Sequence, residues 1–420
     1  MTTDPADLDT SVSFQPLAAR QDGLDGHAER RQVRPGLILA YLFTSSGVLA
    51  FGLAVLPALT TTFRSIHGLS GGQVGNLHNL KDLGAIVLVL AGAAILHRIG
   101  LVAALNAAVV MGLAGCGAFL VVPGMLGLLL GAFLHGAAFS LGMMTIVTML
   151  FRLPAAYQRI SAVFATYGVA SFLAPVSVAL LATPARGYAP VYILYALVFV
   201  PVLVAGVLLG WAQGPRRDDG ASAESARFLT KAQLRFWAPD LAAYSALMAA
   251  ETIVEVWITS LAQYTYGASI AAASVLLSTL WIIHTGVRAS GDVLARWLSP
   301  RRVVLVGSVV GICGTTIACL GNMTLAYTGM VIFAIGVAAL VPVYQGWVLS
   351  QVPSHVHPPM NAALCIGGTI SVTATVWLTG LAVDVDTLLP FAVAVVLMLL
   401  AVVRVARTPQ RASGPDRPRS

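Results

Sequence analysis

Charged residues are scarce in this chain. Asp, Glu, Lys and Arg make up 10% of its 420 residues, whereas they make up about 25% of an average soluble domain. Cysteine is also scarce, and its four copies (Cys116, Cys313, Cys319 and Cys365) all lie in long apolar runs. Cysteines in such runs act as small packing residues, so the sequence predicts no disulfide framework and no zinc or haem site.

The chain also lacks the motifs of an ATP-driven or catalytic domain. It has no Gly-x-x-x-x-Gly-Lys-Ser/Thr phosphate loop, the motif whose backbone cradles the phosphates of ATP. The polar segments between the apolar runs are short, and they hold no Ser/His set, paired carboxylates or metal cluster. We therefore expect neither an ATPase nor an enzyme, and no cofactor; a membrane enzyme or a transport-derived sensor is the alternative class.

Long apolar runs are what the chain does have, and 58% of its residues are hydrophobic. A helix that crosses a bilayer needs about 20 apolar residues, and continuous runs favour helices over a β-barrel because lipid offers the backbone no hydrogen-bond partner. The expected fold is all-α and integral to the membrane. Twelve spans are predicted near residues 36–63, 74–96, 101–122, 124–150, 160–182, 188–211, 238–262, 270–295, 303–321, 324–350, 361–383 and 386–407.

The placement of basic residues supports this count. With both termini in the cytoplasm, 20 of the 24 Lys and Arg fall in cytoplasmic segments, as the positive-inside rule requires. The exceptions are Arg64 and Arg186 in outside loops and Lys81 and Arg288 within spans. The net charge of +7 then reflects contact with lipid headgroups, not a nucleic-acid partner. An excess of Arg over Lys is typical of a GC-rich bacterial genome, so we expect a bacterial inner-membrane protein.

Polar segments divide the chain into five parts. Residues 1–35 and 408–420 are expected to be disordered cytoplasmic tails, and residues 212–237 a cytoplasmic linker. The linker separates an N-terminal six-helix bundle, 36–211, from a C-terminal six-helix bundle, 238–407. Transporters are commonly built from two such repeats, with the substrate site between them.

The turns after the second and eighth spans resemble a loop signature of the major facilitator superfamily, Gly-x-x-x-Asp-Arg-x-Gly-Arg. The matching residues are Arg98 and Gly100 in the first half and Gly291, Arg296, Arg301 and Arg302 in the second. The residues that depart from the signature are Ala93, His97, Leu101 and Ala295. The resemblance covers 36–407. It implies a small-molecule transporter that works as a monomer, and it gives Arg98, Gly100 and Arg296 a role in conformational gating.

Ionisable residues inside the spans are candidates for function, because each costs at least about 2.5–3.5 kcal/mol to insert near the bilayer centre. Glu251 and Glu255 are four residues apart in the seventh span, and His284, Arg288 and Asp292 have the same spacing in the eighth. Each set therefore shares one helix face. We expect a contact of Arg288 with Glu251 or Glu255. It would serve as a proton site or, alternatively, as a buried ion pair that fixes helix packing; Asp292 is expected to brace the turn that follows.

The second span is polar in its first half. His78, Lys81 and Asp82 lie within about one helical turn, so we expect them to contact substrate or protons at the outer mouth of a cavity. One alternative is a gate in which these polar side chains bond to one another instead of to a substrate. The other is a helix that begins later than residue 74.

Further substrate-binding candidates lie in other spans. His135 is a lone ionisable residue of the fourth span, and the alternative to a substrate contact is a structural histidine that is hydrogen-bonded within the protein. In the superfamily the first, fourth, seventh and tenth helices line the central cavity. This implies roles for Tyr41, Ser45, His135, Tyr344, Gln345 and Trp347.

Together these features predict a secondary active transporter that moves a small organic solute by alternating access. Proton coupling is expected through Glu251, Glu255 or Asp82. Few acids among mostly neutral cavity candidates favour efflux of a drug, siderophore or other metabolite. A proton-coupled symporter for uptake of a small organic nutrient and a facilitator without ion coupling are the alternatives.

Overall fold

The computed structural model describes residues 34–154, 157, 160–183, 185–213, 229–289, 298–353 and 356–408. Within these ranges the chain is helical, with turns between the helices and no β-strand. Most of the expected tails (1–35 and 408–420) and of the expected linker (212–237) falls outside the described residues.

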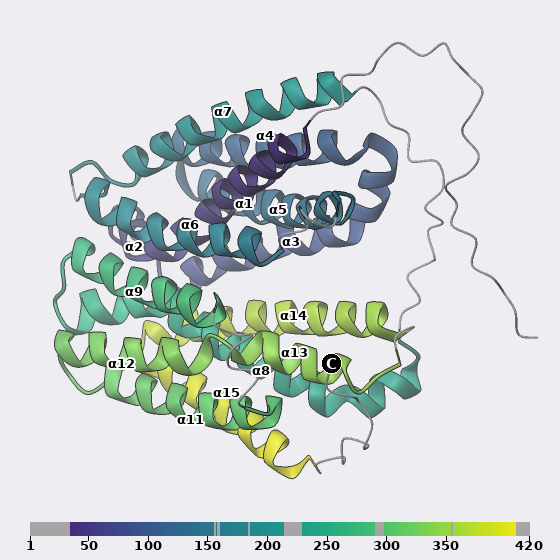
Figure 1. The fold of residues 1–420 in the computed structure, drawn as a ribbon. Coiled ribbons are helices and arrows are strands. Elements are labelled where there is room, and N and C mark those ends of the chain that lie inside the picture. Colours follow the sequence, from purple (N-terminus) through teal and green to yellow (C-terminus); the bar gives the residue numbers. More distant parts are fainter. Residues whose placement is uncertain are drawn as a thin grey trace, which may run out of the picture.

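Two groups of helices lie one above the other (Figure 1). The first group comprises α1 (Pro35–Ala58), α2 (Thr60–His67), α3 (Gly71–Ile99), α4 (Leu101–Val121), α5 (Gly124–Phe151), α6 (Ile160–Leu181) and α7 (Ala189–Gln213). The second comprises α8 (Lys231–Ser260), the π-helical turn η2 (Leu261–Thr265), α9 (Ile270–Ala289), α11 (Pro300–Ala318), α12 (Met323–Val337), α13 (Leu340–Leu349), α14 (His357–Val383) and α15 (Leu389–Arg407). We call these groups the first and the second half.

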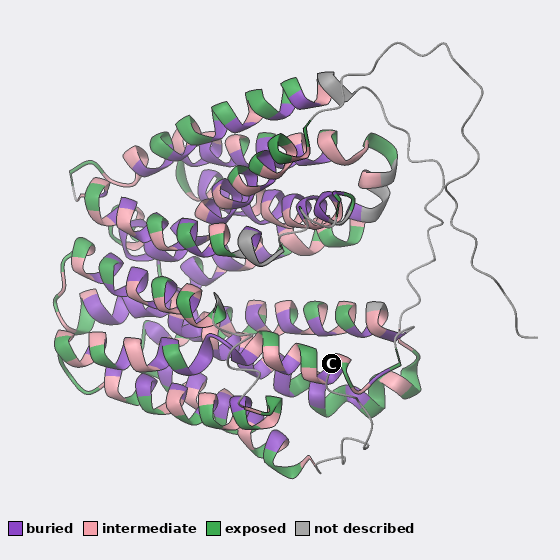
Figure 2. Cartoon of the chain, viewed as in Figure 1, coloured by how far each residue is buried: buried purple, intermediate pink, exposed green. Residues whose placement is uncertain are grey.

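Apolar side chains cover the outside of the molecule as well as its interior. In the described part of the chain, ten helices are long and apolar enough to cross a membrane; α3 and α6 are not among them. Exposed residues follow the outer faces of both halves (Figure 2), and they include Leu90, Leu180 and Leu197, each more than 60% exposed. Water would disfavour so many exposed apolar side chains, whereas lipid accommodates them, so the structure is that of a multi-pass membrane protein.

Several helix ends differ from those expected. α3 begins at Gly71 because Ser70 and Gln73 form a reciprocal capping box, and α8 begins at Lys231 because Thr230 and Gln233 form another. Each box satisfies two backbone N–H groups that a helix start leaves free. The alternative that the second span begins later than residue 74 is therefore wrong.

Two expected helices are interrupted. The segment 36–63 is divided at Leu59 into α1 and α2, and the segment 324–350 is divided between Val337 and Leu340 into α12 and α13. The second break has a clear cause in Pro342. Proline has no N–H, so the carbonyl of Ala338, four residues earlier, receives no helical hydrogen bond from it.

The halves contact each other chiefly through two helix pairs, α3 with α14 and α6 with α9, and α1 and α2 also contact α8. We call the end of the molecule where α1 begins and α15 ends the tail end, and the opposite one the loop end. At the loop end the side chain of Asp384, just after α14, accepts hydrogen bonds from the backbone N–H of Gly71 (2.7 and 2.9 Å) and from Arg64 (2.7 Å). The backbones approach so closely that a Cβ on Gly71 would clash with the carbonyl of Gly380. The first half is thus held to the second at this end.

Candidate functional site

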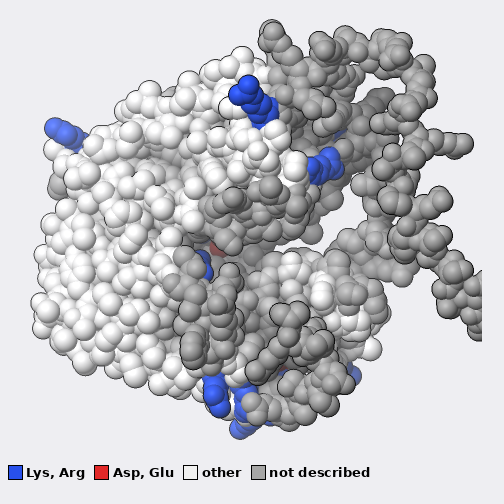
Figure 3. Space-filling view, in the orientation of Figure 1, with Lys and Arg blue, Asp and Glu red and all other residues white. Residues whose placement is uncertain are grey.

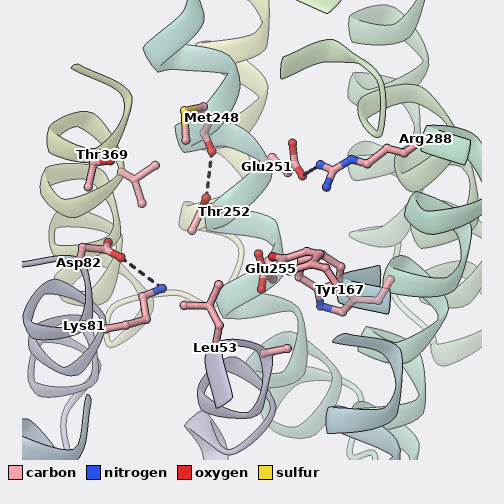
Figure 4. Close-up of a pocket in the computed structure, with 13 residues that line it drawn as sticks. Leu53, Lys81, Asp82, Tyr167, Met248, Glu251, Thr252, Glu255, Arg288 and Thr369 are labelled. Carbon is pink, nitrogen blue, oxygen red and sulfur yellow. Dashed lines mark hydrogen bonds and ion pairs between the residues drawn. The ribbon is translucent and has the colours of Figure 1, made fainter. Parts of the chain in front are cut away.

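A cavity of about 240 Å³ lies between the two halves (Figure 4). Its walls come from α1, α3 and α6 of the first half and from α8, α9 and α14 of the second. The lining residues are Leu53, Ala54, Lys81, Asp82, Tyr167, Met248, Glu251, Thr252, Glu255, Trp281, Arg288, Thr369 and Val372. In Figure 3 most Lys and Arg patches lie near the edge of the face drawn, whereas the one acidic patch visible lies in a hollow, beside a basic patch.

The first charged pair of the cavity belongs to the second half. Arg288 on α9 donates a hydrogen bond to Oε1 of Glu251 on α8 at 2.9 Å. His284, one turn before Arg288, lies behind this pair, and its Nδ1 is 3.5 Å from the same carboxylate oxygen. The expected contact of Arg288 is therefore formed with Glu251. The side chain of Glu251 is 14% exposed, whereas that of Arg288 is 36% exposed and reaches the cavity.

Arg288 also contacts the break between α12 and α13. Its Nε donates to the carbonyl oxygen of Ala338 at 2.9 Å, which is the acceptor that Pro342 leaves without a helical donor. One guanidinium therefore joins the acid on α8 to the interrupted helix.

The second charged pair belongs to the first half. Nζ of Lys81 is 3.3 Å from Oδ1 of Asp82, and both side chains are 11% exposed. Thr373 on α14 lies across the boundary, with its hydroxyl 3.5 Å from Oδ2 of Asp82. α3 packs tightly on α5 behind this pair, since a Cβ on Gly136 would clash with the backbone of Lys81.

Glu255 is the remaining charged residue of the lining. It lies one turn after Glu251 on the same face of α8, and its carboxylate points toward Tyr167 (Figure 4). No described residue forms a hydrogen bond or an ion pair with it. The rings of Tyr167 and Trp281 meet edge to face with centroids 6.0 Å apart, so they form a shared aromatic wall of the cavity.

Five of the predicted residues therefore meet in one cavity: Lys81, Asp82, Glu251, Glu255 and Arg288. His284 contacts Glu251 from behind, although it is not part of the lining. His78 is buried one turn before Asp82, and its Nε2 lies 3.5 Å from the hydroxyl of Thr60 rather than in the cavity wall.

The candidates on the other expected cavity helices lie elsewhere. His135 on α5 is buried inside the first half, where its Nδ1 is 2.8 Å from the Gly131 carbonyl and its ring packs on Phe119 and Tyr195. Tyr41 donates to Asn106 at 2.8 Å, and Ser45, also on α1, is fully buried. None of these belongs to the cavity lining.

The candidates near the tail end of the second half form a separate polar network. Tyr344 donates to Asp240 at 3.1 Å, and Asp240 is paired with Arg404 at 2.7 Å. Trp347 packs against the ring of Tyr344, and Gln345 bonds to Asn361.

The signature turn after the second span is present as a tight connection. Gly100 joins α3 to α4 with a positive φ of 79°, a conformation that favours glycine, and Arg98 before it is exposed. Asp292 and Arg296, the corresponding candidates of the second half, lie outside the described residues.

The cavity also contains residues that the sequence did not single out. Tyr167 and Trp281 form its aromatic wall, and Met248, Thr252 and Thr369 complete it. They have no distinctive spacing in their apolar helices. The one available signal was the position of Tyr167 and Trp281 near the middle of their spans, since aromatic residues of membrane helices concentrate at the interfaces.

Comparisons with known proteins agree with this architecture. The nucleoside transporter NupG has a similar structure, with a TM-score of 0.68, 12% identity, and coverage of 88% of this chain and 97% of that one. The D-xylose-proton symporter gives a TM-score of 0.67 and 12% identity, covering 87% and 97%. The peptide transporter POT in complex with sulfate gives 0.70 and 13%, covering 92% and 96%. No curated protein matches the sequence.

At these identities the solved structures establish the fold and nothing finer. The family is established by sequence, because the model of the Major Facilitator Superfamily matches residues 37–371. That range covers nearly all of the first half, the second half as far as the middle of α14, and every lining residue of the cavity except Val372. The chain is therefore a membrane transport protein, not an enzyme, and it belongs to the Major Facilitator Superfamily.

Proposed function

We propose that this protein is a secondary active transporter that exports a small organic solute by alternating access, with protons as the coupling ion. One observation carries the proposal: both halves line a single cavity, and three carboxylates, Asp82, Glu251 and Glu255, meet there. A site shared by two repeats is accessible from alternate sides when the repeats rock against each other.

The carboxylates differ in their surroundings, which suits them to different tasks. Asp82 and Glu251 each have a cationic partner, and Glu255 has none among the described residues. A carboxyl group away from water takes up a proton more readily, whereas a neighbouring cation favours its ionised form. We therefore assign proton uptake to Glu255 first, with Glu251 and Asp82 responding to changes in their ion pairs.

Alternating access also needs contacts that break. In the proposed cycle the contacts of Asp384 with Arg64 and Gly71 hold the loop end closed, so the cavity would open toward the tail end. Loss of these contacts would then open the opposite side. Their hydrogen bonds to a charged group are worth about 1.5–3 kcal/mol each, a range that a solute and a proton can offset together.

The membrane topology belongs to the same proposal. The ten qualifying helices, together with α3 and α6, would make twelve spans, six in each half. Both termini would lie in the cytoplasm, in a bacterial inner membrane, and the protein would act as a monomer. Residues 212–237 would form the cytoplasmic linker between the two bundles.

The first test compares small molecules inside cells and in the medium for a strain lacking this protein and a strain that has it. A compound that accumulates inside the deletion strain and disappears from the medium is an exported cargo. A compound left unconsumed outside reverses the proposed direction and favours the symporter. Uptake of that compound into proteoliposomes, with and without a pH gradient, then tests proton coupling.

A further inference from the structure

The charges of the cavity are not balanced. Its five charged side chains are Lys81, Asp82, Glu251, Glu255 and Arg288. Two carboxylates are matched with two cations, at 3.3 Å in the first half and 2.9 Å in the second. The unmatched carboxylate of Glu255 gives the cavity a formal charge of −1. The side chain of Glu255 is half-buried, and a carboxylate partly removed from water is stabilised by a proton or by a cation beside it.

We infer that the solute is an organic monocation with an apolar or aromatic body, and that its cationic group binds the carboxylate of Glu255. This inference rests on the proposed function, in that it takes the cavity between the halves to be the transport site. It goes further by naming the chemical class of the cargo.

The walls around Glu255 suit such a solute. The ring of Tyr167 lies beside the carboxylate (Figure 4), and the ring of Trp281 packs against Tyr167 in the same cavity wall. Aromatic faces attract cations by about 0.5–2 kcal/mol. Leu53 and Met248 add apolar and thioether contacts from the opposite halves. With about 240 Å³, the cavity is smaller than the roughly 300–1,000 Å³ typical of drug-sized ligands, so it fits a small cation.

Anionic solutes are disfavoured by the same contacts. Arg288 already bonds to Glu251 and to the Ala338 carbonyl, and Lys81 is paired with Asp82. An anion would have to displace an internal carboxylate from one of these cations and leave it unpaired, whereas a cation at Glu255 displaces nothing but a proton.

Protons and cations therefore compete for one group. The charged and titratable lining groups that face Glu255 are Glu251 on its own helix α8, Lys81 and Asp82 on α3, Arg288 on α9 and Tyr167 on α6; those of α1 and α14 are uncharged. Lys81 and Arg288 are already paired with Asp82 and Glu251. The charge of Glu255 is therefore neutralised by the solute or by a proton. Because each excludes the other, alternating access would exchange them.

The test measures equilibrium binding to the full-length protein in lipid nanodiscs by titration calorimetry. The probes are two permanent cations, benzyltrimethylammonium and N-methylquinolinium, with neutral 3-phenylpropanamide and anionic 3-phenylpropionate for comparison. We expect at least one cation to bind at least tenfold more tightly than the amide and the carboxylate. Its affinity should fall as the pH is lowered, because protons then occupy Glu255.

Variants identify the group responsible. Glu255→Gln should weaken cation binding at least tenfold and remove its pH dependence, and Glu255→Asp, which keeps the charge, should restore part of the affinity. Asp386→Asn is the matched control, because it removes one carboxylate that, within the described part of the chain, hydrogen-bonds only locally, to the backbone N–H of Leu388. It should bind like the original protein.

The outcomes separate this inference from the proposed function. If neither cation binds, if the amide binds equally well, or if Glu255→Gln binds the cation normally, the inference is overturned. Proton-driven flux of the cellular cargo would in that case still uphold the proposed function. If a cation binds in the expected way but no gradient drives transport of any cargo, the site stands and the proposed transport cycle fails.

Discussion

Nε of Arg288 donates a hydrogen bond to the carbonyl oxygen of Ala338 at 2.9 Å, within the break between α12 and α13. Pro342 leaves this carbonyl free, and the same guanidinium holds Glu251 at 2.9 Å. The proline thus creates an acceptor that a side chain of another helix uses. A change in the charge of Glu251 alters one contact of Arg288 and so acts on the other.

Replacing Pro342 with Ala tests this relationship. The new N–H can bond to Ala338 and compete with Arg288, and removal of an interior proline from a helix stabilises it by up to about 3 kcal/mol. We expect a higher melting temperature and slower transport. Pro201→Ala in α7 is the control, because Pro201 lies inside an uninterrupted helix and away from the cavity. Equal effects of the two substitutions on transport would contradict the role of the break.

Breaking the pair of Glu251 and Arg288 should reveal their coupling. Arg288→Ala leaves Glu251 as a second unmatched carboxylate in the cavity, and removal of one partner from a buried pair typically costs about 3–5 kcal/mol. The cost here is smaller, because the arginine side chain is 36% exposed. We expect Arg288→Ala combined with Glu251→Gln to be more stable than Arg288→Ala alone.

The measurement for this pair is a double-mutant cycle on thermal stability in detergent. A coupling energy of about 0.5–3 kcal/mol is typical of residues in contact. Additive effects of the two substitutions would show that the contact contributes nothing to stability, and the role assigned to Arg288 would then lose its basis.

The contact at the loop end should control which side of the molecule is open. Asp384→Asn keeps the shape of the side chain but removes the negative charge that faces Arg64 and the N-terminus of α3, where the helix dipole favours an anion. We expect the population open at the loop end to rise. Distances between spin labels placed on the two halves at this end would report the shift.

Asp386→Asn again serves as the control. Asp386 is two residues from Asp384 but bonds within its own half, to the backbone N–H of Leu388, so its replacement should leave the distance distribution unchanged. An Asp384→Asn protein with the original distribution would show that these hydrogen bonds do not set the conformation.

The sequence predicted the ionisable core of the site and the family, but not how the halves meet. The four-residue spacing of Glu251 and Glu255 fixes their common helix face whatever surrounds it, so that prediction needed no tertiary information. The distance between Asp82 and Thr373 depends on how two helices nearly 300 residues apart pack, which local patterns do not encode. Tyr344 was assigned by family position alone, and His135 by its isolated position in a span together with family position. Each forms its hydrogen bond within its own half.

Proton coupling, finally, should depend on the three acids to different degrees. Glu255→Gln cannot exchange a proton, so in proteoliposomes it should carry the cargo only down its own gradient, with rates that no longer respond to an imposed pH gradient. Glu251→Gln should lower the rate but keep a pH response, because Glu255 remains. Asp82→Asn should do the same, since the Lys81 pair lies on the opposite wall. If the pH response survives in Glu255→Gln and disappears in Glu251→Gln, the proton site is Glu251, the acid paired with Arg288, and not Glu255.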